Sequence, residues 1–167
     1  MHTRLIALAA CAVLLGACGS KTDDVVDESA VNPDSSLNQS ELAGPTPGTQ
    51  EDLEVNVGDR VFFAFDSSTL SPQAQETLRR QAAWLNQYGD LNVIVEGHAD
   101  ERGTREYNLA LGARRAEAAR SFLTASGVAA NRVTTVSYGE ERPANPGSNE
   151  QAWAENRRAV TVLNVTN

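Results

Sequence analysis

Two short segments, around residues 55 and 63, alternate apolar and polar residues, which is typical of half-buried strands. Their apolar positions are Leu53, Val55, Val57, Val61, Phe63 and Phe65. Gly58 and Asp59 lie between the two segments, and glycine at the first central position suits a tight turn. The pattern therefore predicts a short hairpin strand ahead of the main fold.

Helical spacing begins after Ser71, a residue type that caps helices well, and Pro72 follows at the first helical position. One apolar stripe comprises Ala74, Leu78, Ala82, Leu85 and Tyr88. It predicts a helix that ends at Gly89. A second helix is predicted over residues 104–126 and a short one over residues 152–156. Trp84 and Trp153 fall within these helices, and we expect both to pack in the core.

Further strands are predicted over residues 91–95, 133–138 and 159–165. The order of strands and helices is then β-α-β-α-β-β after the hairpin strand. Helices that cover one face of a mixed four-stranded sheet satisfy this order. The predicted fold class is a two-layer α/β (α+β) sandwich.

The first 18 residues indicate secretion. Arg4 precedes an apolar run over residues 5–15, which is too short to cross a bilayer as a helix. The run leads into Leu15-Gly16-Ala17-Cys18, which resembles the bacterial lipoprotein signal. The resemblance implies cleavage after residue 17 and acylation of Cys18 with fatty acids such as palmitate. Because Gly19 follows the cysteine, it also implies sorting to the outer membrane, with the rest of the chain in the periplasm.

Residues 18–50 are expected to be a disordered tether after the acylated cysteine. Residues 19–50 contain six acidic residues and one basic residue, and the segment has no aromatic side chain. The whole chain has a formal net charge of −8, which argues against nucleic acid as a partner. The predicted domains are therefore the signal peptide at 1–17, the tether at 18–50 and a folded domain at 51–167.

The loop that follows the predicted strand at residues 91–95 carries the candidate chemistry. Asp100 lies in this loop, while Asn108 and Arg115 are seven residues apart and share one face of the next helix. A fixed carboxylate and a fixed guanidinium can bind a zwitterion, because Arg takes a carboxylate bidentately and Asp takes an ammonium. The alternative is that Asp100 and Arg115 pair with each other.

The same stretch has a specific family resemblance. The segments VEGHADERGT-x-EYN, LGxRRAxAA, VSYGEERP and NRRAV resemble the OmpA-like family, in particular its lipoproteins that associate with peptidoglycan. The resemblance covers about residues 55–165. It implies non-covalent binding of diaminopimelate in the peptidoglycan stem peptide. The implied ligand contacts are Asp100, Arg115, Asn108, Ala99, Asp66, Phe65 and Arg157.

Two departures from the family pattern bear on this transfer. Arg105 stands where these lipoproteins often have Pro, and its cation could alter the affinity for an acidic stem peptide. The loop after Asp66 is shorter than in some relatives, which weakens any transfer to Ser67 or Ser68.

An enzyme is the alternative of a different class. His98, Asp100 and Glu101 resemble a possible metal or hydrolytic cluster, but the mature chain keeps one His and has no free Cys. We therefore predict no catalytic residues, no metal and no cofactor.

A second alternative is a periplasmic protein-interaction module. The resemblance implies TolB as a partner, together with other components of the Tol-Pal system. This system acts in envelope integrity and in constriction at cell division.

Overall fold

The computed structural model describes residues 44–164, and the predicted signal peptide, Cys18 and most of the predicted tether lie outside them. The helices are α1 (Gln50–Asp52), the π-helix η2 (Leu53–Val57), α2 (Pro72–Gln87), α3 (Arg105–Ala125), the 3-10 helix η3 (Ala130–Arg132) and α4 (Glu150–Asn156). The strands are β1 (Arg60–Phe62), β2 (Val93–His98), β3 (Val133–Gly139) and β4 (Arg158–Leu163). No helix among the described residues is long and apolar enough to cross a membrane.

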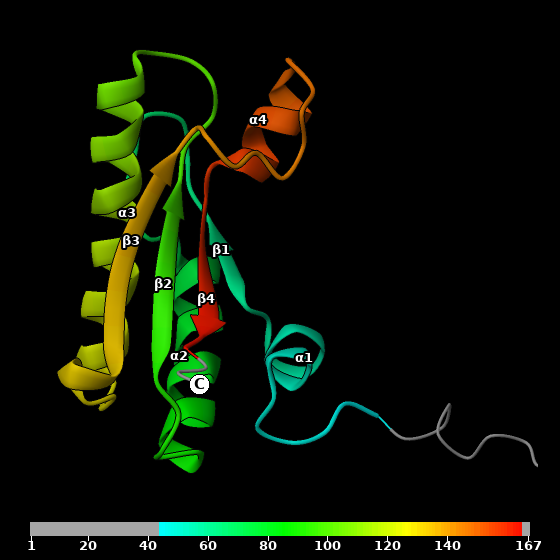
Figure 1. Cartoon of the computed structure of the whole chain (residues 1–167), viewed down its shortest axis with the longest axis vertical. Coiled ribbons are helices and arrows are strands. Elements are labelled where there is room, and N and C mark those ends of the chain that lie inside the picture. The colour runs from blue at the N-terminus through cyan, green and yellow to red at the C-terminus, as the bar shows by residue number, and fades with distance from the viewer. Residues whose placement is uncertain (1–43, 165–167) are drawn as a thin grey trace, which may run out of the picture. The chain divides into compact units, whose positions relative to one another are not determined.

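The four strands form one mixed sheet in the order β1-β4-β2-β3. β4 pairs antiparallel with both β1 and β2, whereas β2 and β3 are parallel. Helices α2 and α3 cover one face of this sheet, and α4 lies beyond its upper end (Figure 1). The predicted two-layer sandwich with a mixed four-stranded sheet is confirmed.

The core lies between the sheet and the two long helices. Alternate residues of β2, Val93 and Val95, are 1% exposed and face the helices, as a period of two requires. Leu78 and Leu85 of α2 and Leu123 of α3 fill the opposite side. Trp84 also belongs to this core, as predicted, with 7% of its surface exposed.

The predicted hairpin strand is wrong. Residues 50–57 are helical, and Val55, which the alternation required to face the core, is 65% exposed. The reason is a contact that local patterning does not reveal. The Asp52 carboxylate accepts hydrogen bonds of 2.8 Å from the Trp84 indole and from the Gly48 N–H. Thr49 caps α1, so the segment folds as a helical cap on α2.

Gln81 is a fully buried polar side chain in the middle of α2. Its amide nitrogen donates to the Gly58 carbonyl at 2.6 Å, and its amide oxygen accepts from the Thr161 hydroxyl at 2.8 Å. The side chain thereby joins α2 to the turn before β1 and to β4.

We expect Gln81→Met to lower the free energy of unfolding by about 2 kcal/mol, because the half-buried Gly58 carbonyl and the buried Thr161 hydroxyl both lose their partner. Denaturant unfolding measures the change. Gln73→Met, at an exposed position of the same helix, is the matched control and should change stability by less than about 0.5 kcal/mol. Equal unfolding midpoints for the two variants would contradict this role.

Candidate functional site

A charged pocket lies at the end of the sheet where β2 stops and α3 begins. Its volume is about 210 Å³. Side chains from the turn after β1, from the β2–α3 loop and from the first turns of α3 line it. The lining residues are Phe65, Asp66, Asp100, Arg102, Gly103, Tyr107, Asn108, Leu111 and Arg115.

Five of the seven predicted ligand contacts meet in this pocket: Phe65, Asp66, Asp100, Asn108 and Arg115. The other two do not line it. Ala99 is buried, donates its N–H to the Gly139 carbonyl and faces a neighbouring cavity. Arg157 lies behind Asp100, 3.3 Å from its carboxylate.

Arg115 is a buried cation that lines the pocket. Its side chain is 0% exposed, and it donates to the backbone carbonyls of Ser67 and His98 at 2.8 Å and of Ala64 at 3.2 Å. Burial lowers the pKa of Arg115 to about 10, so the guanidinium stays charged at neutral pH. Among the described residues no carboxylate forms an ion pair with it.

Asp100 is bound by two other arginines and not by Arg115. Arg102 Nη2 lies 2.8 Å and Arg157 Nη1 lies 3.3 Å from the same carboxylate oxygen. Burial opposes ionisation of Asp100, but hydrogen bonds from Arg102 and Arg157 outweigh it and lower the pKa of this carboxyl. The predicted alternative, a direct Asp100–Arg115 pair, is therefore wrong.

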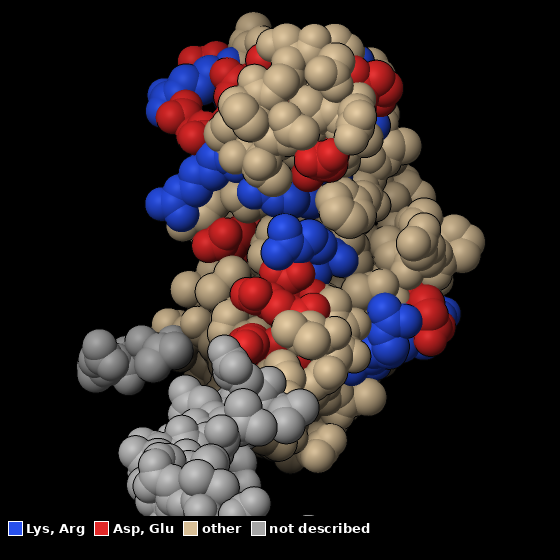
Figure 2. Space-filling model, turned by 90° about the vertical axis from the view of Figure 1, so that its right-hand side faces the viewer, with Lys and Arg blue, Asp and Glu red and all other residues tan. Residues whose placement is uncertain are grey.

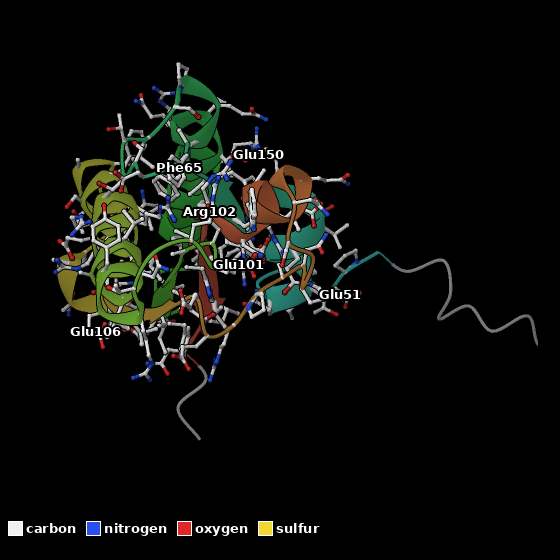
Figure 3. The ribbon with its side chains drawn as sticks, turned by 90° about the horizontal axis from the view of Figure 1, so that it is seen from above. Glu51, Phe65, Glu101, Arg102, Glu106 and Glu150 are labelled. Atoms are coloured by element: carbon white, nitrogen blue, oxygen red, sulfur yellow. The ribbon has the colours of Figure 1, made fainter. Side chains whose placement is uncertain are left out.

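Glu150 of α4 completes a closed ring of alternating charges. Arg157 Nη2 lies 2.9 Å from Glu150 Oε1, and Arg102 Nη1 lies 3.5 Å from Glu150 Oε2. We call Asp100, Arg102, Glu150 and Arg157 the charge ring. It joins the β2–α3 loop to α4, and its members Arg102 and Glu150 lie close together at this end of the sheet (Figure 3).

Two aromatic rings hold Arg102 in place. Its guanidinium carbon lies 4.1 Å from the ring centres of both Phe65 and Trp153. Sequence reasoning missed this arrangement and expected Trp153 in the core. Trp153 is instead half-buried and donates its indole N–H to Glu101 at 3.0 Å. Arg102 stands two residues after Asp100, and this spacing was a local indication that the two side chains pair. No local feature indicated where Trp153 lies.

Asn108 and Tyr107 join the start of α3 to two other segments. The Asn108 amide donates to the Glu140 carboxylate and to the Arg102 carbonyl, so it holds the β2–α3 loop in place. The Tyr107 hydroxyl donates to the Asp66 carboxylate across the pocket mouth. Arg105, the departure from the family pattern, forms an ion pair with Glu141, so that carboxylate offsets its charge.

His98 lies outside the pocket. It is 1% exposed, and neither ring nitrogen has a hydrogen-bond partner among residues 44–164. No group of three His, Cys, Asp or Glu side chains in that part of the chain converges to hold a metal ion. The face shown in Figure 2 carries basic and acidic side chains interspersed. The pocket itself is lined by Asp66, Asp100, Arg102 and Arg115, the side chains of a charged binding site.

A two-layer sandwich with this strand order and a charged pocket at the end of its parallel strand pair defines an OmpA-like domain. The model of the OmpA family matches residues 62–157, and the chain belongs to this family. Relatives named peptidoglycan-associated lipoprotein align with most of this chain. The one from Mesorhizobium japonicum is 51% identical over 95% of this chain and 90% of its own length. The one from Agrobacterium fabrum is 59% identical over 71% of this chain and 67% of its own length.

Solved structures agree with this assignment. The peptidoglycan-associated lipoprotein of Burkholderia pseudomallei superposes with a TM-score of 0.62 at 42% identity, over 64% of this chain and 90% of that one. The C-terminal domain of Helicobacter pylori MotB superposes with a TM-score of 0.59 over 65% of this chain and 85% of its own. At 22% identity it shows the shared fold alone.

Proposed function

We propose that the folded domain binds peptidoglycan non-covalently, through the zwitterionic end of diaminopimelate in the stem peptide. The observation that carries this proposal is the buried Arg115 guanidinium, which lines the pocket without a carboxylate partner among the described residues. A buried cation of this kind favours an anionic ligand group, because the pocket walls exclude competing water. The names of the relatives refer to association with peptidoglycan, which supports the wall as the source of this ligand.

The pocket provides both charges that such a ligand needs. A guanidinium has five N–H donors, and hydrogen bonds to three backbone carbonyls leave two for a ligand carboxylate. Asp66 and Asp100 contribute carboxylates to the same pocket, which suits the ammonium on the same carbon. Phe65 and Asn108 line the same pocket, and Arg157 lies behind Asp100. The proposed role is binding without catalysis.

The remainder of the chain gives this binding a place in the envelope. In our proposal Cys18 is acylated and anchors the protein in the outer membrane, and the acidic segment that follows lets the domain reach the wall from the periplasmic side. More than one acyl chain is needed for stable anchoring. The protein thus links the outer membrane to the wall as part of the Tol-Pal system, in support of envelope integrity and constriction at division.

TolB is the proposed protein partner. Its docking surface is proposed to include two exposed aromatic side chains, of which Tyr107 lines the pocket and Phe62 does not. Phe62 is 48% and Tyr107 43% exposed, as suits a contact surface rather than core. If wall binding were incidental to a pure TolB-interaction module, the chain without TolB would not sediment with walls.

Co-sedimentation of the full chain, purified in detergent, with isolated walls tests the proposal. Arg115→Lys should weaken binding by about tenfold or more, since Lys cannot bind a carboxylate bidentately. Arg114→Lys is the matched control, because Arg114 is the adjacent exposed arginine, and it should bind as the wild type does. Raising the salt concentration to about 1 M should also reduce wild-type sedimentation.

Thermal unfolding of Arg115→Lys, followed in parallel, separates loss of the site from loss of the fold. The proposed function is overturned if the wild type does not sediment with walls. It is also overturned if Arg115→Lys is folded and sediments as the wild type does.

A further inference from the structure

Strand β1 lies at one side of the sheet, and its pairing with β4 decides which of its backbone groups face outward (Figure 1). The Asp59 carbonyl accepts from the Thr161 N–H at 2.7 Å, and the Phe63 N–H donates at 2.9 Å to the residue before β4. Backbone groups alternate in direction along an antiparallel strand. The N–H and C=O groups of Arg60 and Phe62 therefore point away from β4, to the outer edge.

This outer edge of β1 is unpaired. None of the hydrogen bonds among residues 44–164 uses these two N–H donors and two carbonyl acceptors. Native proteins often protect such an edge with a charged residue, as Arg60 does here. Phe62 does not protect it, because an aromatic ring that is 48% exposed beside unpaired backbone groups favours association. The edge is therefore suited to strand addition, in which an extended peptide takes up the free hydrogen-bonding groups.

A large cavity adjoins this edge where β1 approaches α4. Its volume is about 420 Å³. Most of the side chains that line it are apolar, and the lining includes Phe62, Phe63, Ala64, Ala154 and Glu155. A large apolar side chain opposite Phe62 would lose its contact with water here, which stabilises a bound peptide.

A smaller cavity of about 110 Å³ adjoins the edge on its other side, where Val61, Ala74 and Thr77 line it. Val61 faces the helices, so this cavity suits a modest side chain from the peptide residue opposite Val61. The two cavities share Phe62 and Ser71, and we call them, with the free edge of β1, the edge groove. Walls from α2 and α4 suit one extended chain, whereas a second copy of the domain would bring its own helices to the same edge.

The end of the edge groove at Arg60 is basic. Arg60 is exposed, and its one ion pair among the described residues is with Asp59 at 2.7 Å. Arg80 donates to the Thr77 hydroxyl at 3.3 Å and forms no ion pair with any residue between 44 and 164. Opposite charges on facing residues stabilise an antiparallel pair, so an acidic residue suits the position opposite Arg60.

We propose that the edge groove binds an extended peptide segment of a partner protein as an added antiparallel strand. In the order of the peptide, a large apolar residue lies opposite Phe62, a β-branched residue opposite Val61 and an acidic residue opposite Arg60. The first and third residues exchange backbone hydrogen bonds with β1, and the N–H of the middle residue points away from it. This inference goes beyond the proposed function, because the edge groove lies outside the charged pocket and needs no wall ligand.

The probe is the fluorescently labelled peptide Ser-Thr-Phe-Val-Glu-Thr-Ser, and its anisotropy with the full chain in detergent measures the affinity. N-methylation of the peptide Phe or Glu removes a donor that pairs with β1, so each should weaken binding by about tenfold or more. N-methylation of the peptide Val is the matched control. Its N–H points away from β1, so this peptide should bind within about twofold of the unmodified one.

The charge preference is tested with a second peptide that has Lys in place of Glu. The wild type should bind it about fivefold more weakly, because like charges then face each other across the strand pair. Arg60→Glu should invert this preference. Arg114→Glu makes the same change at an exposed arginine outside the edge groove and should keep the wild-type preference. Arg115→Lys should bind both peptides as the wild type does, which separates this site from the charged pocket.

Three results would overturn the inference. The first is a wild type that does not bind the peptide at about 1 mM. The second is equal affinity for all N-methylated peptides, which would indicate an apolar contact without strand addition. The third comes from sedimentation velocity of the chain without peptide: self-association that Phe62→Ala abolishes would assign the edge to a second copy of the chain.

Discussion

Gly97→Ala is expected to lower the free energy of unfolding by about 3 kcal/mol, at the upper end of the cost of overpacking a core. Gly97 lies on β2 and faces Gly112 of α3, where the strand and the helix make backbone contact. A Cβ at Gly97 would overlap the Gly112 carbonyl oxygen and lie 3.1 Å from the Ala116 Cβ. Backbone cannot move aside as a flexible side chain can, so α3 must shift away from the sheet.

This shift should also weaken wall binding. Arg115 follows Gly112 by one helical turn, and its guanidinium bonds to the His98 carbonyl next to Gly97. A displaced α3 pulls the cation away from the pocket. The expected result is a thermal midpoint lower by about 10 °C or more, together with reduced sedimentation with walls.

Gly89→Ala is the matched control for this substitution. Gly89 is exposed after α2, and an added Cβ there would meet no atom within 4 Å. Its unfolding midpoint should stay within about 2 °C of the wild type, in keeping with a surface substitution. If both variants melt with the wild type, the close approach of α3 to β2 does not limit stability.

Local signals explain why so much of the fold could be predicted. Ser71 and Thr104 are N-caps, and the structure starts α2 and α3 directly after them, as expected. Alternation likewise located the strands of the sheet. The failure at residues 53–57 arose because the same apolar spacing permits a strand or a helix. The deciding contact joins Asp52 to Trp84, which is 32 positions away.

The start of the domain at residue 51 stays a prediction. Several contacts cross that boundary in the structure. Among them, the Gly48 N–H donates to Asp52, and the Gln50 side chain accepts from the Leu163 N–H at 2.8 Å. A fragment that is meant to fold alone should therefore begin before Thr46, whose carbonyl accepts from the Thr49 N–H and hydroxyl.

The site was predictable only in part for a similar reason. The seven-residue spacing of Asn108 and Arg115 correctly brought both to one helix face, and the loop position of Asp100 brought it to the same pocket. Sequence could not reveal the whole charge ring around Asp100, because Arg102 is near it along the chain but Glu150 and Arg157 are about 50 positions away. Charge pairing across a fold depends on topology, and single-sequence patterns do not contain it.

Acid is expected to destabilise the domain strongly through His98. Burial, together with the nearby cations Arg158 and Arg142, lowers the pKa of His98 to about 4 from its ordinary 6.5. The ring stacks on Tyr138 with centroids 5.6 Å apart. Among residues 44–164, Glu96 is the one carboxylate within 4 Å of the ring, and its 3.6 Å distance from Nε2 is too long for a hydrogen bond. The folded protein therefore keeps this ring neutral.

The direction of the effect follows from proton binding. Between pH 6.5 and about 4 the unfolded chain binds a proton at His98 and the folded chain does not, so acid favours unfolding. The contribution of neutral His98 to the free energy of unfolding is fully present above pH 6.5. It is lost progressively as the pH falls, by about 3 kcal/mol in total once the pH reaches 4.

Denaturant unfolding of the wild type and of His98→Leu between pH 7.5 and 4 isolates this contribution. Leu cannot titrate, and no hydrogen bond is lost, because the ring nitrogens have no partner among the described residues. As the pH falls from 7.5 to 4, the free energy of unfolding of the wild type should drop by about 3 kcal/mol more than that of His98→Leu. Carboxylates that titrate in both proteins contribute equally and cancel in this difference. Parallel curves would show that His98 titrates alike in the folded and unfolded chains.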